Sequence, residues 1–423
     1  MSEPPVGARP RLLAWLTEAP AASRKALLAA SLGWMLDSFD VMLYSLVLAS
    51  LMLDLHLTKA SAGILGSMTL VAAAVGGLFF GVIADRFGRT RALMASVLLY
   101  AVFTAACGFA HSFASLAVFR ILLGFGMGGE WASGASLVSE TWPAEHRGKA
   151  LGLMQSSWAI GYALAALVAA VVMPRWGWRG VFFVGVLPAF FTLWIRRDVA
   201  EPEAWTESRK KSRREPRGTG SGAGFASLFR GPLLPLTVAL TLMNACCLFA
   251  WWGFNLWVPA YLSLPASRGG VGLGSHAMTG IVVFMQLGMW LGYVTFGYIS
   301  DVFGRKRTYV VYLLCAAGLL VLFSRLHTAV PLFLLAPCVA FAATGYFSGF
   351  AAVTAEVYET RIRSTAQGFT YNTGRLASAA APFIVGSLAD RHGFGAAFLA
   401  SAVAFAAAAL LWRAIPELSL IHI

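Results

Sequence analysis

The chain has 423 residues, of which 58% are hydrophobic and only 12% are charged, and its mean hydropathy is +0.72. A soluble domain carries about 25% charged residues, so this composition excludes an ordinary soluble protein. The net charge of +13 would suggest nucleic-acid binding in a soluble chain, but here the basic residues lie between long apolar runs, and no nucleic-acid partner is expected.

The apolar runs are long enough to cross a bilayer, which requires about 20 residues for each helix. Helices are expected because lipid offers no water to backbone groups, and the runs are too long and too uniformly apolar for barrel strands. The sequence therefore predicts an all-α integral membrane protein with twelve transmembrane helices, at residues 26–52, 60–84, 91–110, 114–138, 148–173, 179–195, 234–262, 277–299, 308–325, 329–357, 364–389 and 394–415.

One long polar segment divides these spans into two groups of six, which predicts two pseudo-symmetric six-helix bundles at residues 26–195 and 232–415. The segment between them, 196–231, is rich in basic residues and glycine, cannot form a packed core, and is predicted to be a cytoplasmic linker. Residues 1–25 lack the apolar core of a signal peptide and are predicted to be a cytoplasmic segment. Residues 416–423 break the pattern of the chain and are interpreted as a partly artificial tail.

The basic residues are distributed unequally between the two sides of the membrane that alternating loops define. One side holds 24 of the 32 Lys and Arg residues, the other side holds six, and two lie within spans. The positive-inside rule therefore predicts a multi-pass protein of the cytoplasmic membrane with both termini in the cytoplasm. Many of these charges are also expected to contact lipid headgroups.

A set of glycine and charged residues occurs twice in the chain with a constant offset (297 − 81 and 356 − 140 both give 216). Charged networks at cytoplasmic helix junctions can hold two halves together in one state and release them in another, as alternating access requires. The alternative is that they fix only loop geometry and topology, although Asp and Glu contribute little to topology. The predicted gating residues are Gly81, Asp85, Arg89, Glu140 and Arg147, with Asp301, Arg305, Glu356 and Arg363 in the second half.

Few ionisable residues lie within the spans, where each costs about 2.5–3.5 kcal/mol and marks a functional candidate. Asp37 and Asp40 are three residues apart and share one helix face, with Asp40 near mid-membrane. Two neighbouring carboxylates repel each other in a low dielectric, so one retains a proton more readily, which suits proton coupling. The alternative is a structural pair bonded to the backbone or to Ser38. The other ionisable residues of the spans are Arg120, Glu130 and Arg375.

Arg375 is the sole basic residue within the spans of the second half and lies about 17 Å into its span. Its planar guanidinium suits a carboxylate, which predicts a binding site for an organic anion. The alternative is a structural pairing with a carboxylate of the protein. Candidate neighbours, for which helix packing is the alternative role, are Asn372, Tyr371, Gln286, Asn255, Trp251 and Trp252.

Residues 124–129 match the dinucleotide fingerprint G-x-G-x-x-G, but they lie inside a span without a preceding strand. Gly124 and Gly128 instead predict close helix packing through small residues. The chain contains no P-loop sequence and no set of nucleophile and base, so neither an ATP-driven pump nor an enzyme is predicted. No cofactor and no metal site are expected.

Residues 81–91 resemble the signature loop between helices two and three of the major facilitator superfamily, and residues 297–307 resemble its second-half copy. Residues 120–128 resemble the helix-four motif of that superfamily, and residues 140–147 resemble the motif that joins helices four and five. The resemblance covers residues 26–415 and implies a twelve-helix transporter.

The sequence Asp37-Ser38-Phe39-Asp40 resembles the helix-one pattern of aromatic-acid/proton symporters and sialate/lactate-type symporters, although Ser38 stands where those families usually have Gly. Residues 128–131 look most like the sialate/lactate type. Proton-coupled sugar porters carry a related helix-one Asp with a helix-four Arg as its partner. The resemblance thus implies that Asp40 is the proton site and that Arg120 is its switch partner.

Together these patterns predict a secondary active transporter that imports an organic anion, such as a monocarboxylate, sialate or aromatic acid, by proton symport with alternating access. Asp37, Asp40, Glu130 and Arg120 would carry the proton coupling, and Arg375 would hold the carboxylate. The expected partners are the anion, protons and membrane lipid, and the protein is expected to be monomeric. The alternatives are proton-coupled uptake of a sugar or another polar metabolite, drug/proton antiport, and a signalling protein with this fold.

Overall fold

The computed structural model describes residues 14–198, 228–231, 233–359 and 362–416. A few side chains within these ranges, among them those of Asp85 and Arg363, also lie outside the description. Most of the predicted linker and nearly all of the predicted tail fall outside the described residues, so both stay predictions.

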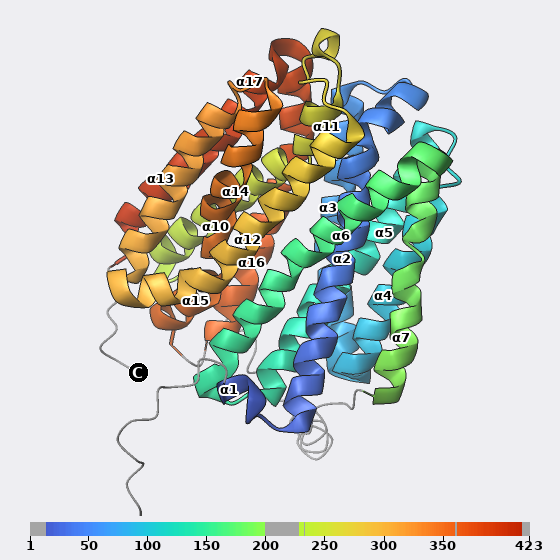
Figure 1. Ribbon diagram of the computed structural model, residues 1–423. Helices are drawn as coiled ribbons and strands as arrows, with labels where there is room; N and C mark the ends of the chain where they lie inside the picture. The colour runs from blue at the N-terminus through green and yellow to red at the C-terminus, as the bar shows by residue number, and fades with distance from the viewer. Residues whose placement is uncertain (1–13, 199–227, 232, 360–361, 417–423) are drawn as a thin grey trace, which may run out of the picture.

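Long helices run side by side along one direction and form two groups (Figure 1). The first half contains the short α1 (Ala14–Thr17), then α2 (Ala21–Asp54), α3 (Lys59–Phe87), α4 (Arg89–Cys107), α5 (Phe113–Thr141), α6 (Ala144–Val184) and α7 (Leu187–Asp198). The second half contains α10 (Leu233–Asn255), α11 (Val258–Ser263), α12 (Ser275–Phe303), α13 (Arg305–Phe323), α14 (Ala329–Thr344), α15 (Phe350–Val357), α16 (Arg363–Ser378) and α17 (Ala381–Leu411), with short 3-10 turns at Ala266–Arg268, Gly345–Gly349 and Trp412–Ala414.

Ten continuous stretches of helix in the described chain are long and apolar enough to cross a membrane, where the sequence predicted twelve spans. Two of them, His146–Thr192 and Ala366–Ala414, have 47 and 49 residues. At 1.5 Å per residue each is about 70 Å long, roughly twice the hydrocarbon thickness of a bilayer, so each must cross twice. Counted in this way, the ten stretches provide the twelve spans.

The chain turns back within both long stretches at a glycine in a conformation that other residues rarely adopt. Gly177 in α6 has φ 65° and ψ −171°, and Gly393 in α17 has φ 78° and ψ 169°. These two residues are 216 positions apart (393 − 177), the offset of the predicted repeat. Gly88 and Gly304, with φ of 119° and 89°, repeat in the same register between successive spans. The two halves therefore turn at equivalent glycines.

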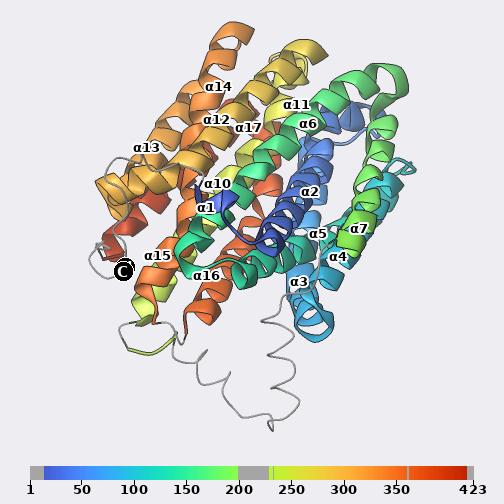
Figure 2. The ribbon, with the colours of Figure 1, turned by 60° about the horizontal axis from the view of Figure 1, so that its bottom comes forward.

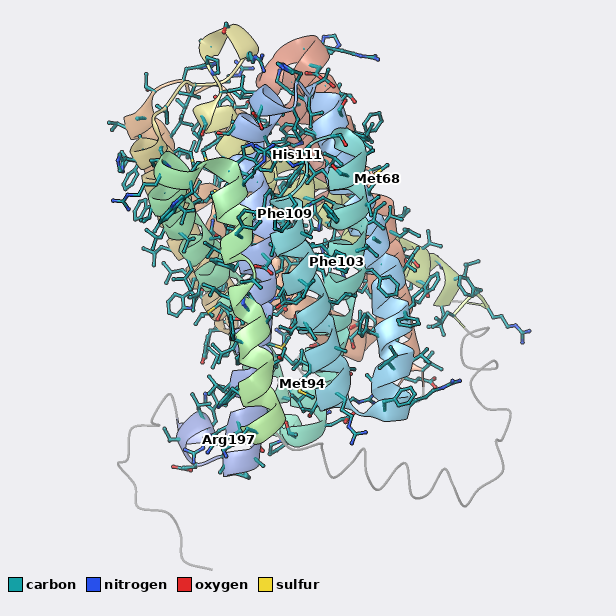
Figure 3. The ribbon with its side chains drawn as sticks, turned by 90° about the vertical axis from the view of Figure 1, so that its right-hand side faces the viewer. Met68, Met94, Phe103, Phe109, His111 and Arg197 are labelled. Carbon is teal, nitrogen blue, oxygen red and sulfur yellow. The ribbon has the colours of Figure 1, made fainter. Side chains whose placement is uncertain are left out.

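The two ends of the molecule carry different elements (Figure 1). We call them the α1 end, where α1 and α15 lie, and the α11 end, where α11 and the turn of α17 at Gly393 lie. Figure 2 brings the α1 end toward the viewer, with α15 and α3 on opposite sides of it. Figure 3 shows Arg197 near the α1 end and His111 near the α11 end, with Phe103 and Phe109 on the flank between them.

The glycines of the false nucleotide fingerprint lie inside α5, as predicted, and pack against α3. A Cβ atom on Gly124 would collide with the carbonyl oxygen of Thr69, and one on Gly128 would collide with that of Ala73. Small residues thus let two helix backbones approach closely, which confirms the packing prediction.

Candidate functional site

A small cavity of about 40 Å³ lies between the two halves and has room for only a few water molecules. Its wall is mainly aromatic and includes one cationic side chain, Arg375. Trp158 of α6 is at the centre of the aromatic group, with ring centroids 4.7 Å from Trp34, 5.7 Å from Trp251 and 6.3 Å from Trp252. The residues that line the cavity are Trp34, Met127, Gln155, Trp158, Leu248, Trp251, Trp252, Tyr293, Phe347, Tyr371 and Arg375.

Arg375 lies near the end of α16 and is only 6% exposed. Within the described part of the chain its guanidinium has no carboxylate within ion-pair distance, but it interacts electrostatically with Asp37 of α2. Tyr371, one helical turn earlier, also lines the cavity. The structure therefore sets one buried cation of the second half opposite an acidic residue of the first half.

Three carboxyl groups of the first half are fully buried: Asp37, Asp40 and Glu130. Asp40 accepts a hydrogen bond of 3.1 Å from the hydroxyl of Thr104, whereas both oxygens of Asp37 and both of Glu130 have no hydrogen-bond partner among the described residues. Asp37 interacts electrostatically with the other two carboxyl groups as well as with Arg375. Asp37 thus connects this carboxyl cluster (Asp37, Asp40 and Glu130) to the central cavity.

The hydroxyl of Ser38, which the sequence offered as a structural partner for the two aspartates, points elsewhere. It donates a hydrogen bond of 2.7 Å to the carbonyl oxygen of Trp158. Ser38 therefore joins α2 to α6 beside the aromatic group and leaves the carboxyl cluster without that donor.

Arg120, which the family resemblance implied to be the switch partner of Asp40, contacts a tyrosine in this structure. It is 1% exposed, and its guanidinium carbon lies 4.0 Å from the ring centroid of Tyr44. Tyr44 follows Asp40 by one helical turn toward the α11 end, so Arg120 is level with the tyrosine rather than with the acid. The guanidinium thus makes a cation–π contact with Tyr44, and the role of Arg120 as a switch partner stays a prediction.

The predicted neighbours of Arg375 separate into two groups. Trp251, Trp252 and Tyr371 line the cavity with it. The other three lie outside the cavity wall: the amide nitrogens of Asn372 and Gln286 donate to backbone oxygens within their own helices, and Asn255 lies where α10 ends. Substrate contact by any of the six stays a prediction.

Sequence reasoning missed the seven other residues that line the cavity, which are Trp34, Met127, Gln155, Trp158, Leu248, Tyr293 and Phe347. The search for functional residues concentrated on charges, and these side chains carry none. Tryptophan is enriched at the membrane interfaces, so a tryptophan well inside a span, such as Trp158, was an available signal.

The predicted gating residues form ion pairs at the α1 end, and each pair lies within one half. Arg89 donates from Nε and Nη2 to Oε1 of Glu140, at 3.0 and 2.8 Å. Arg305 makes the equivalent contact of 3.2 Å with Glu356 and a second of 2.9 Å with Asp301.

Of the four other gating candidates, two have described side chains, and neither takes part in these ion pairs. Arg147 has a weak contact of 3.5 Å with the carbonyl oxygen of Trp142, and a Cβ atom on Gly81 would meet open space. The side chains of Asp85 and Arg363 lie outside the described residues.

Hydrogen bonds between the halves, where both residues are described, lie between the centre and the α11 end. The hydroxyl of Ser45 donates to the carbonyl oxygen of Leu256, at 2.6 Å, in the break between α10 and α11. Closer to the α11 end, Asp390 of α17 accepts from the backbone nitrogens of Lys59 and Ala60 at the start of α3. The protein is therefore closed between its halves at the α11 end.

Known proteins are similar to this chain in sequence and in fold. The family model of the Major Facilitator Superfamily matches residues 30–285 and 263–419. A probable 4-methylmuconolactone transporter of Cupriavidus pinatubonensis is 33% identical and covers 93% of this chain and 91% of its own length. The sialic acid transporter NanX of Escherichia coli is 29% identical over 94% of this chain and 95% of its own. The solved xylose transporter XylE from E. coli, in an inward open conformation, shares the fold with a TM-score of 0.74 at 18% identity, covering 94% of this chain and 98% of that chain.

The family match extends over both halves, and the twelve spans, the repeated junctions and the central cavity agree with it. The chain therefore belongs to the Major Facilitator Superfamily and is a multi-pass membrane transporter, not an enzyme.

Proposed function

We propose that this protein imports a small organic carboxylate together with protons, by alternating access, as a monomer in the cytoplasmic membrane. The observation that carries the proposal is Arg375, a buried cation in an aromatic cavity between the halves that has no ion-pair partner among the described residues. Relatives named as transporters of 4-methylmuconolactone and sialic acid support a substrate of this class.

The chemistry of the cavity favours a carboxylate attached to a flat or apolar body. The guanidinium of Arg375 can donate two parallel hydrogen bonds to a carboxylate, which a neutral sugar cannot accept in the same way. Rings such as Trp158 and Trp252 offer flat apolar surfaces to the rest of the molecule. Because the free space is only about 40 Å³, the rings must separate when substrate enters.

Proton coupling follows from the competition of two anions for one cation. When Asp37 is ionised it attracts Arg375, and this attraction must be given up before a substrate carboxylate can take the guanidinium. A proton on Asp37 removes its charge and leaves Arg375 available. Proton and carboxylate therefore favour each other's binding, which is the linkage that symport requires.

Asp40 and Glu130 extend the path of the proton away from the cavity. Their carboxyl groups interact with Asp37, and Thr104 orients Asp40. In this proposal the proton is held by these three groups and not by a residue of the cavity wall. This assigns coupling to the first half and substrate recognition to the second.

The ion pairs at the α1 end and the contacts at the α11 end belong to the alternating gate. We assign the α1 end to the cytoplasm because most basic residues lie in the loops on that side. With the α11 end closed, the halves must separate there and approach each other at the α1 end to admit substrate from outside. The Arg89–Glu140 and Arg305–Glu356 pairs keep each half rigid during this movement.

A counterflow screen in proteoliposomes tests the substrate class, with aromatic and aliphatic carboxylates compared against sugars and cationic drugs. The best substrate is then titrated calorimetrically into the wild type, Arg375→Lys and Arg375→Ala. The Lys variant keeps the charge but loses the planar guanidinium, so a carboxylate should bind it at least about tenfold more weakly, and the Ala variant should not bind it measurably. Full affinity in Arg375→Ala, or a neutral sugar as the best substrate, would contradict the proposal.

A further inference from the structure

A second and larger cavity, of about 520 Å³, lies at the α11 end between the two halves. It lies among the α2–α3 loop, the loop after α11 and the turn of α17 at Gly393, near the top of Figure 1. Nothing in the transport mechanism above uses it. Its wall includes Lys59 and Asp390, whose contact helps to close this end, and in the proposed orientation a molecule arriving from outside would meet the cavity first.

The cations that line this outer cavity are Lys59 and Arg268, and its one carboxylate is that of Asp390. Arg268 is exposed, and its guanidinium forms neither an ion pair nor a hydrogen bond with another described residue. It is near enough to Lys59 for the two cations to repel each other. Two cations beside a single carboxylate leave an excess of positive charge, which attracts a further anion.

Asp390 also holds the two halves together at this cavity. Its Oδ2 accepts a hydrogen bond of 2.8 Å from the backbone nitrogen of Ala60, and its Oδ1 accepts one of 3.2 Å from that of Lys59. A carboxylate of the second half thus occupies the N-terminus of α3 in the first half, where the helix dipole favours an anion. The ammonium of Lys59 lies 3.8 Å from the same Oδ1 and donates to the carbonyl oxygen of Ala389.

We propose that the outer cavity is a capture site for a small carboxylate, which Arg268 and Lys59 bind and which competes with Asp390 for Lys59. Occupation of the site weakens the contact between Asp390 and α3, so that an external carboxylate promotes the opening of the α11 end. The inference rests on the proposed function for the substrate class and for the outward orientation of this end. It concerns other residues than the Arg375 site, and its binding can be measured without transport.

A fluorine label near the cavity reports binding directly. Ser267 is exposed and lines the cavity, so Ser267→Cys can carry a trifluoromethyl label, while labels on the exposed Cys315 and Cys338 provide internal references. Benzoate is the probe, and benzamide, with the same ring and no charge, is the control ligand. Benzoate should shift the resonance of the label at position 267 saturably, and benzamide should not.

Three variants test the assignment of the charges. Arg268→Gln should weaken benzoate binding about fivefold, the factor that corresponds to about 1 kcal/mol for an exposed ion pair. Asp390→Asn removes the competing carboxylate, so this variant should bind benzoate more tightly than the wild type. Arg391→Gln changes an exposed arginine beside Asp390 that does not line the cavity, and should have no effect.

The outcomes separate this site from the central one. The benzoate-induced shift of the label at position 267 should persist in Arg375→Ala. The outer cavity can therefore be tested even if Arg375 does not bind a carboxylate. A linear response to benzoate, an equal response to benzamide, or unchanged binding in Arg268→Gln would each overturn the inference. Weaker binding in Asp390→Asn would also overturn it, because the competition would then be absent.

Discussion

The two halves of the molecule share the residues that form turns and junctions, but they differ in their central ionisable groups. The turning glycines Gly177 and Gly393, and the ion pairs of Arg89 and Arg305, recur with one offset. The central ionisable groups do not recur. The positions 216 residues after Asp37 and Glu130 hold Gly253 and Tyr346, and the position 216 residues before Arg375 holds Ala159.

The difference indicates which features serve the fold and which serve the transport reaction. Both halves must turn in the same way and keep their junctions rigid, so those parts can be identical. In the proposed function, proton coupling uses a carboxyl group and substrate binding uses a cation, and the structure has these opposite charges in different halves. Under the proposed alternating access, movement of the halves relative to one another would change the distance between Asp37 and Arg375 and so couple protonation to conformation.

The largest effect is expected from the carboxyl cluster of the first half. Asp40→Asn removes a titratable group from the path that leads to Asp37, so uphill accumulation driven by a pH gradient should be lost while counterflow exchange continues. Uptake and counterflow in proteoliposomes measure both activities. Accumulation on a proton gradient by the Asn variant would remove Asp40 from the coupling path.

The turning glycines should give the next largest effect, and it should be equal in the two halves. Gly177→Ala and Gly393→Ala each place a side chain where φ is 65° or 78°, and in both cases a Cβ atom would meet open space. The cost is therefore backbone strain alone, about 1–3 kcal/mol in each variant. Thermal unfolding in detergent should show matched destabilisation, with Gly280→Ala, a helical glycine also facing open space, as the control. A large difference between the two variants would break the equivalence of the turns.

The smallest effects are expected at the junctions of the α1 end. The side chains of Arg89 and Glu140 are 15% and 24% exposed, and those of Arg305 and Glu356 are 11% and 22% exposed. Glu140→Gln and Glu356→Gln should therefore each cost about 1 kcal/mol or less, and should slow transport to similar extents. Arg179→Gln, which breaks the more exposed pair with Asp54 at the α11 end, provides a matched control. A strong effect in only one half would show that the junctions act unequally.

The sequence predicted the spans, the repeat and the buried charges because each has a local signature. An apolar run, a constant offset or a carboxyl group inside a span is visible without a structure. The contact of Arg120 with Tyr44 and the central position of Trp158 depend on the relative axial positions of neighbouring helices. The sequence of a single span contains no information about those positions. That Asp37 and Arg375 face each other likewise depends on packing between the halves. The sequence identified each residue as a candidate but did not pair them.

The central claim, that Asp37 and the substrate carboxylate compete for Arg375, is tested most directly by the pH dependence of binding. Affinity for the best counterflow carboxylate should be measured by calorimetry across a series of pH values in the wild type and in Asp37→Asn. The wild type should bind more weakly as the pH rises, because ionised Asp37 holds Arg375, whereas Asp37→Asn should bind with the same affinity throughout the series. If Asp37→Asn lost affinity with rising pH as steeply as the wild type, the competition would not occur at Asp37.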